Sequence, residues 1–108
     1  MSPYDLHPEA LRDLDAIWSY IAQDNLEAAN RSLHRILDTI ETAASMPRIG
    51  SRRPDLTSRP LRFLYLHSWL IAYAPDEQPL WIVAILDGRR DPRVLAAILR
   101  ERESKDSV

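Results

Sequence analysis

In Leu80-Trp81-Ile82-Val83-Ala84-Ile85-Leu86, seven apolar residues follow one another without a break, and Asp87-Gly88-Arg89-Arg90-Asp91-Pro92 comes directly after them. An unbroken apolar run of this length is typical of a strand that is buried on both faces of a sheet. The charged residues behind it are typical of a tight turn around Gly88. We therefore expect a rigid interior strand whose end presents Arg89, Arg90 and a carboxylate to a polyanion or to an acidic partner.

Two more strands are expected just upstream of this segment. Apolar and aromatic residues over 61–66 and 69–74 predict them, with a tight bend at His67-Ser68. Residues 75–79 include two prolines and are typical of a turn that leads into the buried strand. Short turns between consecutive strands predict an antiparallel meander.

The first half of the chain has the period of amphipathic helices. Apolar residues recur every three or four positions over about residues 8–23 and again over about residues 26–44, and the short link predicts an antiparallel pair. Pro8 suits the first helical position, Asp24-Asn25 can cap the second helix, and Asp91-Pro92 can start a short third helix. The apolar stripe of the first helix comprises Leu11, Leu14, Ile17, Trp18 and Ile21.

With a brief edge strand at residues 4–7, the predicted order is β-α-α-β-β-β-α, an α/β chain of the α+β type. Its 108 residues predict a single domain, and residues 103–108 a frayed tail. The chain has no cysteine, which excludes disulfides and thiolate sites and fits a reducing cytoplasm. Its first residues form neither a signal peptide nor a membrane span, so we expect a cytoplasmic protein.

Charge is unevenly distributed along the chain. Residues 1–45 hold eight acidic residues against three arginines, whereas residues 46–74 hold five arginines against one aspartate. Residues 75–88 are acidic again and residues 89–108 are basic, although the formal net charge is only −2. This asymmetry suggests surfaces with different partners, and the alternative is a pair of helices with solvated acidic faces.

Arginine dominates the candidate binding residues. Residues 45–60 contain three prolines and Gly50, which predicts a long basic loop, and loops of this length are often functional. Arg62 lies within an apolar strand, where it either points outward, pairs with Asp87 or Asp91, or binds a partner. The candidates for bidentate binding of phosphate or carboxylate are Arg48, Arg52, Arg53, Arg59, Arg62, Arg89, Arg90 and Arg93.

Several kinds of site have no sequence support. Two glycines cannot form a glycine-rich phosphate loop, and the three scattered histidines show no metal-binding spacing, so we expect neither a metal nor a cofactor. The aromatic residues could stack on bases, but their positions favour the core. Trp69 or Trp81, which lie near strand ends, are the ones expected to be partly exposed.

The whole chain resembles a known family. Pro8-x-Ala10-x-x-Asp13-Leu14-x-x-Ile17-x-x-Tyr20-Ile21-Ala22 is similar to the first helix of ParE/RelE-type toxins of bacterial type II toxin–antitoxin pairs. The similarity continues through Asn25-x-x-Ala28-Ala29, Met46-Pro47-x-x-Gly50, Arg62, Ile71-Ala72-Tyr73 and residues 82–92, and it covers about residues 3–100. The order and spacing of these motifs are more specific than any one of them.

The resemblance implies a helical hairpin packed on a small antiparallel sheet. It also implies a hetero-oligomer with a cognate antitoxin, whose C-terminal segment occupies an apolar groove and a sheet edge of the toxin. An acidic antitoxin segment would suit the arginine clusters. The resemblance and the arginine pattern together give one set of target- or antitoxin-binding candidates: Arg52, Arg53, Arg62, Trp69, Trp81, Arg89, Arg90 and Asp91.

Two activities occur in this family. RelE-like members cut mRNA on the ribosome, typically with several Lys or Arg and a late Tyr or His, and here the residues for such a ribonuclease would be Arg62, His67 and Arg89. The only lysine is Lys105, no Tyr or His follows Tyr73, and position 87, where the family often has His, is Asp. ParE-like members instead inhibit DNA gyrase by binding.

The missing proton-transfer residues favour the ParE-like branch without a catalytic site. The alternatives are a RelE-like mRNA endonuclease that acts on the ribosome and a member of the family that has lost toxicity and remains a binding module. The departures at Asp87 and at Ala74, where a basic residue is common, favour the last alternative.

Overall fold

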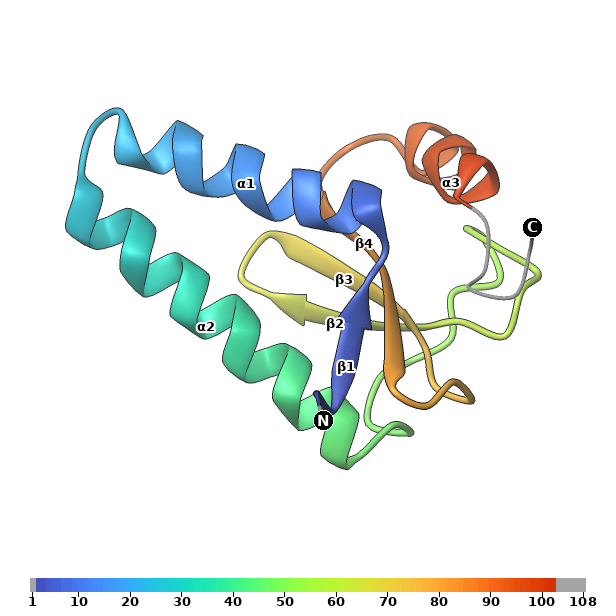
Figure 1. Ribbon diagram of the computed structural model, residues 1–108. Coiled ribbons are helices and arrows are strands. Elements are labelled where there is room, and N and C mark those ends of the chain that lie inside the picture. The colour runs from blue at the N-terminus through green and yellow to red at the C-terminus, as the bar shows by residue number, and fades with distance from the viewer. Residues whose placement is uncertain (1, 103–108) are drawn as a thin grey trace.

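The computed structural model describes residues 2–102, so the tail predicted for residues 103–108 lies outside the described residues. The order of elements in this range is the predicted one, and the fold is α+β (Figure 1). The elements are β1 (Tyr4–Leu6), α1 (Pro8–Ala22), α2 (Leu26–Ser45), β2 (Arg62–Leu66), β3 (Trp69–Ala74), β4 (Leu80–Asp87) and α3 (Pro92–Glu101).

Local capping explains where the helices begin. Pro8 opens α1 as predicted, and the His7 ring accepts a hydrogen bond from the Glu9 N–H at Nδ1 (2.9 Å). The Asn25 side chain accepts from the Ala28 N–H at the start of α2 (2.9 Å), and Asp91 accepts from the Arg93 N–H at the start of α3 (2.8 Å). His7 therefore belongs to a helix cap, and the first strand ends one residue earlier than expected.

The sheet has the strand order β1-β4-β3-β2. The predicted antiparallel meander of β2, β3 and β4 is confirmed. The complete sheet is mixed, however, because β1 pairs parallel to β4, with Tyr4 opposite Leu80 and Leu6 opposite Ile82. A parallel pair requires a long connection between its strands, and here most of the chain provides it.

Strand β4 is the centre of the molecule. Its residues from Leu80 to Leu86 are all buried, as predicted, because helices and loop cover both faces of the sheet. The hairpin of α1 and α2 covers one face, while α3 and the segment around Leu56 and Leu61 cover the other (Figure 1). The link between α1 and α2 projects beyond the sheet.

The apolar stripes of the two hairpin helices, α1 and α2, lie largely where the sequence predicts them. Leu14 and Ile17 of α1 are buried against the sheet, together with Ile36 and Ile40 of α2. Leu11 was expected in the same stripe but is 55% exposed, because Ala10 takes the buried position beside it. None of the helices in the described range combines the length and hydropathy that a membrane span needs.

Strand β4 contains a bulge. The pairing with β3 shifts between Ala72 and Tyr73, so the side chains of Val83 and Ala84 both face the hydrophobic cluster under α3.

Beyond the end of β1, the free edge of β4 is covered by an ion pair between Asp13 of α1 and Arg102 (2.6 Å). Asp13 accepts the Ile85 N–H (3.0 Å) and Arg102 donates to the Val83 carbonyl (3.1 Å).

Candidate functional site

The structure places the predicted binding arginines at two ends of the sheet. Arg62 pairs with Tyr73 at one end of β3, whereas Asp87, which immediately precedes the Arg89–Arg90 turn, pairs with Trp69 at the other end. We call His67, Trp69, Asp87, Arg89 and Arg90 the β4-end surface. We call residues 46–61, between α2 and β2, the basic loop.

At the β4-end surface a carboxylate holds the first arginine in place. Asp87 accepts hydrogen bonds from the backbone N–H and Nε of Arg89 at Oδ1 and from Nη2 at Oδ2, all at 3.0 Å. These charge-assisted bonds lower the pKa of Asp87 to about 2. The Arg89 side chain is nevertheless 74% exposed, so the pair orients the guanidinium without burying it.

The next two residues, Arg90 and Asp91, have different roles in this turn. The Arg90 N–H donates to the Asp87 carbonyl (3.2 Å), but within residues 2–102 its exposed side chain forms neither a hydrogen bond nor an ion pair. Asp91 caps α3 and also pairs with Arg93 (2.9 Å). Asp91 therefore stabilises the turn, while Arg90 is open to a partner.

The bend between β2 and β3 completes this surface. His67 has a positive φ of 56°, in the left-handed region that non-glycine residues seldom adopt. Its Nε2 lies 3.2 Å from Nη1 of Arg35 in α2, and because a guanidinium only donates, Nε2 is the acceptor there. The Gly88 N–H donates to the Ser68 carbonyl (2.8 Å), which ties the bend to the end of β4.

Gly88 is required at this point for steric reasons. A Cβ on Gly88 would lie 2.8 Å from a ring carbon of Tyr65 and 3.2 Å from the Ser68 carbonyl oxygen. The close approach of the two turns therefore depends on glycine.

At the other end of the sheet, Tyr73 anchors the basic loop. Its hydroxyl donates to the Pro47 carbonyl (2.8 Å) and accepts the Gly50 N–H (2.9 Å), and burial raises the pKa of this tyrosine. Ser51 exchanges two backbone hydrogen bonds with Phe63 (2.9 and 2.8 Å). The loop contains no helix or named strand, as its prolines predict, but these bonds give it a fixed path.

The arginines of the basic loop and of β2 are bound within the protein to different degrees. Arg62 donates to the carbonyls of Gly50 (2.7 Å) and Arg48 (3.3 Å), so the pairing with Asp87 or Asp91, one of the alternatives for this residue, is not formed. These aspartates lie at the far end of the sheet, and Arg62 finds loop carbonyls instead.

Arg53 and Arg59 are held by other groups. Arg53 binds both carboxylate oxygens of Asp55 (2.9 and 2.8 Å) and the Tyr65 hydroxyl (2.8 Å), and the bond to Asp55 raises the pKa of Arg53. Arg59 donates to the Leu99 and Arg102 carbonyls at the end of α3 (3.0 and 2.7 Å). Arg52 is exposed and has no hydrogen bond or ion pair among residues 2–102.

The two candidate tryptophans differ in exposure. Trp69 is half-buried at the start of β3. Trp81 is only 9% exposed and packs in the cluster under α3, with its ring 5.7 Å from that of His7. The expectation of a partly exposed Trp81 is wrong because Trp81 lies inside the sheet rather than at a free strand end.

The candidate ribonuclease residues are not assembled. Arg62 and His67 lie at opposite ends of β2, which corresponds to about 16 Å along an extended strand. His67 lies near the end of β4, but Arg62 does not. Among residues 2–102, moreover, no group of three or more His, Asp or Glu side chains is placed to hold a metal ion.

Sequence reasoning missed two partners that the fold brings in. Arg35 reaches His67 from the exposed side of α2, and Asp76 binds Arg48 (3.0 Å) from the turn between β3 and β4. Neither residue carries a local signal, since each contact joins elements that are distant in sequence.

Comparison with protein families agrees with this fold. Residues 4–92 match the family model of the ParE toxin of type II toxin–antitoxin system, parDE. A search of individual curated proteins gives no match. Because the family model spans most of the chain, including the hairpin, the sheet and both arginine-bearing ends, the chain belongs to the ParE toxin family of type II toxin–antitoxin systems.

Proposed function

We propose that this toxin inhibits DNA gyrase by binding it, and that its cognate antitoxin prevents this. Membership of the ParE toxin family implies an antitoxin partner. The ParE-like branch, to which the sequence motifs point, acts by binding and requires no hydrolytic residues. The proposal implies a cytoplasmic location, where gyrase and its DNA substrate are found.

The β4-end surface is the proposed contact with gyrase. Its single most relevant feature is the exposed Arg89–Arg90 pair at the end of a fully buried strand. The hydrogen bonds from Arg89 to Asp87 fix the Arg89 side chain before binding, so contact with gyrase costs little side-chain entropy. Arg90 adds a second cation without an intramolecular pair among the described residues.

The separation of Arg62 from His67 and Arg89 supports binding over RNA cleavage. Cleavage of one phosphodiester needs its acid, base and cations within hydrogen-bond reach of the same phosphate. A spacing of about 16 Å along β2 is several times larger than that reach.

Purified gyrase gives a direct test. We expect the toxin in stoichiometric excess to inhibit supercoiling of relaxed plasmid, and to leave mRNA intact in a translating extract. Absence of inhibition contradicts the proposal. Cleavage of mRNA that His67→Ala abolishes would instead establish the ribonuclease alternative, and expression without growth arrest would establish the binding module.

Arrested cells provide an independent readout. Expression of the toxin without its antitoxin is expected to cause DNA damage, because poisoned gyrase leaves broken DNA. Blocked translation with intact DNA would contradict the gyrase proposal.

A further inference from the structure

Three hollows follow one another along the basic loop. The first, of about 110 Å³, is lined by Arg48, Arg52, Pro60, Leu61, Arg62, Pro75 and Asp76. We call it the loop pocket. The second, of about 320 Å³, shares Arg52 and Leu61 with the loop pocket, and the third, of about 290 Å³, shares residues 57–59 with the second and reaches Arg100 of α3. The three hollows therefore adjoin one another along the loop, and we call them together the trough.

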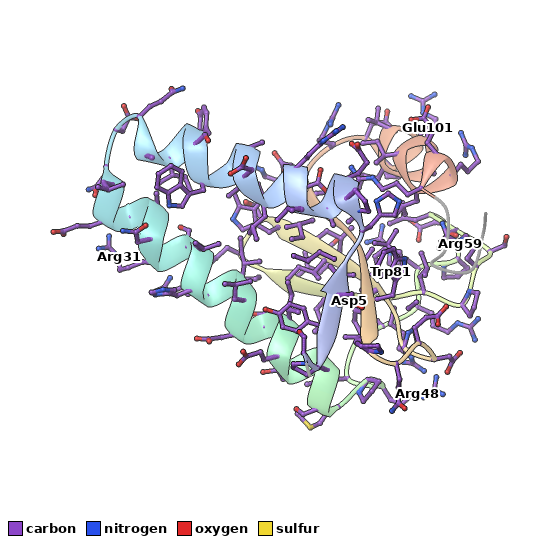
Figure 2. The ribbon with its side chains drawn as sticks, viewed as in Figure 1. Asp5, Arg31, Arg48, Arg59, Trp81 and Glu101 are labelled. Atoms are coloured by element: carbon purple, nitrogen blue, oxygen red, sulfur yellow. The ribbon has the colours of Figure 1, made fainter. Side chains whose placement is uncertain are left out.

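The trough is strongly cationic in a protein with a net negative charge. Among the described residues, its lining includes six arginines and two acidic side chains, Asp55 and Asp76. Figure 2 shows Arg48 and Arg59 on the side of the molecule away from the α1–α2 link, near which Arg31 lies. The trough thus lies at the end of the molecule opposite the α1–α2 link.

Two of the three arginines in the loop pocket bind groups of the protein itself. Arg62 is fixed by the carbonyls of Gly50 and Arg48, and Arg48 is fixed by Asp76. Arg52, which lies between the pocket and the next hollow, has no partner of its own among residues 2–102. A guanidinium fork with its donors open is suited to a carboxylate or a phosphate.

Two features favour a peptide carboxylate over a nucleic acid. Single-stranded nucleic acids bind where aromatic rings stack on their bases, and no aromatic residue of the described range 2–102 lines the trough. Its walls are instead formed by prolines, Leu56, Leu61 and Ala96, which suit the short side chains of a peptide.

Recognition here must come from side chains rather than from strand pairing. Ser51 already binds both backbone groups of Phe63, so the loop closes this part of the β2 edge. A partner in the trough therefore cannot add a strand at this position, and charge must select it.

We propose that the loop pocket binds a carboxylate of an acidic peptide, with Arg52 as the principal ligand-binding residue and Arg48 and Arg62 beside it. The rest of the acidic segment follows the trough past Arg59 toward Arg100. In the unbound protein, the Asp76 carboxylate accepts a hydrogen bond from Nη2 of Arg48, so it competes with the incoming carboxylate for this donor. The pocket binds this group whatever the cellular target of the toxin is.

Binding of a labelled hexaglutamate peptide tests the proposal. Fluorescence anisotropy at low ionic strength should show saturable binding of hexaglutamate and no binding of hexaglutamine. Arg52→Gln should weaken hexaglutamate about threefold, whereas Arg31→Gln, which removes the same charge from α2, should leave it unchanged. Thermal unfolding verifies that Arg52→Gln is folded, as expected for a residue without intramolecular partners in the described range.

A second variant changes binding in the opposite direction. Asp76→Asn removes the competing carboxylate and should tighten hexaglutamate about twofold. The proposal is overturned if hexaglutamate does not bind, if Arg31→Gln weakens it as much as Arg52→Gln does, or if Asp76→Asn weakens it. Tighter binding of a thymidine hexanucleotide than of hexaglutamate would also overturn it, in favour of a nucleic-acid site.

Discussion

The orientation of Arg89 depends on one neighbouring carboxylate. Asp87 binds both the backbone and the side chain of Arg89, so the turn after β4 and the direction of its first cation are fixed together. The pair is exposed, and screening by solvent limits what it adds to stability. Its role is therefore to orient Arg89.

Arg89→Ala should raise the pKa of Asp87 from about 2 toward the ordinary value of 3.8, because the two side-chain hydrogen bonds from Arg89 to the charged carboxylate are lost while the bond from the backbone N–H remains. Since folding lowers this pKa, the contribution of the pair to stability is present above the ordinary value and is lost as the pH falls through about 2. Carbon-13 NMR titration of the Asp87 carboxyl measures the change. Arg93→Ala, which affects Asp91 instead, is the control, and an Asp87 pKa that stays at about 2 in Arg89→Ala would contradict the account.

Tyr73→Phe should lower the free energy of unfolding by about 1–2 kcal/mol, because the Pro47 carbonyl and Gly50 N–H lose their buried partner. Urea denaturation measures the change. Tyr20→Phe is the matched control, since Tyr20 is 73% exposed. Equal stability of the wild-type protein and Tyr73→Phe would show that the hydroxyl does not anchor the loop.

At the scale of single residues, the sequence predicts the features that depend on neighbouring residues in the chain. Pro8, Asn25 and Asp91 were recognised as helix-start residues because a cap acts within three residues of itself. The carbonyl partners of Arg62 and the burial of Trp81 did not follow from the sequence, because both depend on segments that only the complete fold brings near.

Among the elements, the β4 edge depends on a buried ion pair. Asp13 and Arg102 satisfy backbone groups of Ile85 and Val83 that lie beyond the reach of the short β1 strand. Their side chains are only 16% and 10% exposed. The pair thereby joins α1, β4 and the end of α3.

Arg102→Ala should lower the free energy of unfolding by about 3–5 kcal/mol, because it leaves Asp13 charged and without its partner in a mostly buried place. The double variant Asp13→Leu/Arg102→Met should lose less than Arg102→Ala, since no unpaired charge remains. Urea denaturation compares the variants, and amide exchange at Ile85 should accelerate in both. A loss below about 1 kcal/mol in Arg102→Ala would contradict a structural role for the pair.

The cap of α1 should make stability depend on pH. Burial first, and then the charge of Arg102, lower the pKa of His7 below its ordinary 6.5, and a protonated Nδ1 could not accept the Glu9 N–H. The unfolded chain therefore binds the proton more readily, so stability is complete above about pH 6.5 and falls as the pH drops below it.

His7→Asn, which caps without titrating, should lose less stability than the wild-type protein between about pH 7 and about pH 5. Urea midpoints at the two pH values give the comparison. An equal loss in both proteins would show that His7 is not the titrating group.

The elements themselves were predictable because their patterns are periodic and local. The helices α1 and α2 and the three-stranded meander follow from spacing and turn residues. The parallel pairing of β1 and the bulge in β4 did not follow, since they depend on how distant strands meet.

At the scale of the whole molecule, the arginines form two separate surfaces. The β4-end surface and the loop pocket lie at opposite ends of the sheet, so substitutions in one should not change binding at the other. The sequence indicated both clusters of arginine, and only the fold shows that they are apart. The proposed contacts with gyrase and with an acidic peptide therefore lie on different faces of the molecule.

Binding of gyrase by a charge-reversed toxin tests the central claim most directly. Arg90→Glu changes an exposed side chain that is unpaired within residues 2–102, and Arg52→Glu makes the same change at another such side chain, in the loop pocket at the opposite end of the sheet. We predict that Arg90→Glu weakens binding to purified gyrase at least about tenfold, a loss of about 1.4 kcal/mol, while Arg52→Glu binds like the wild-type toxin. Equal affinity of Arg90→Glu and the wild-type toxin would contradict the claim that the end of β4 is the surface that meets gyrase.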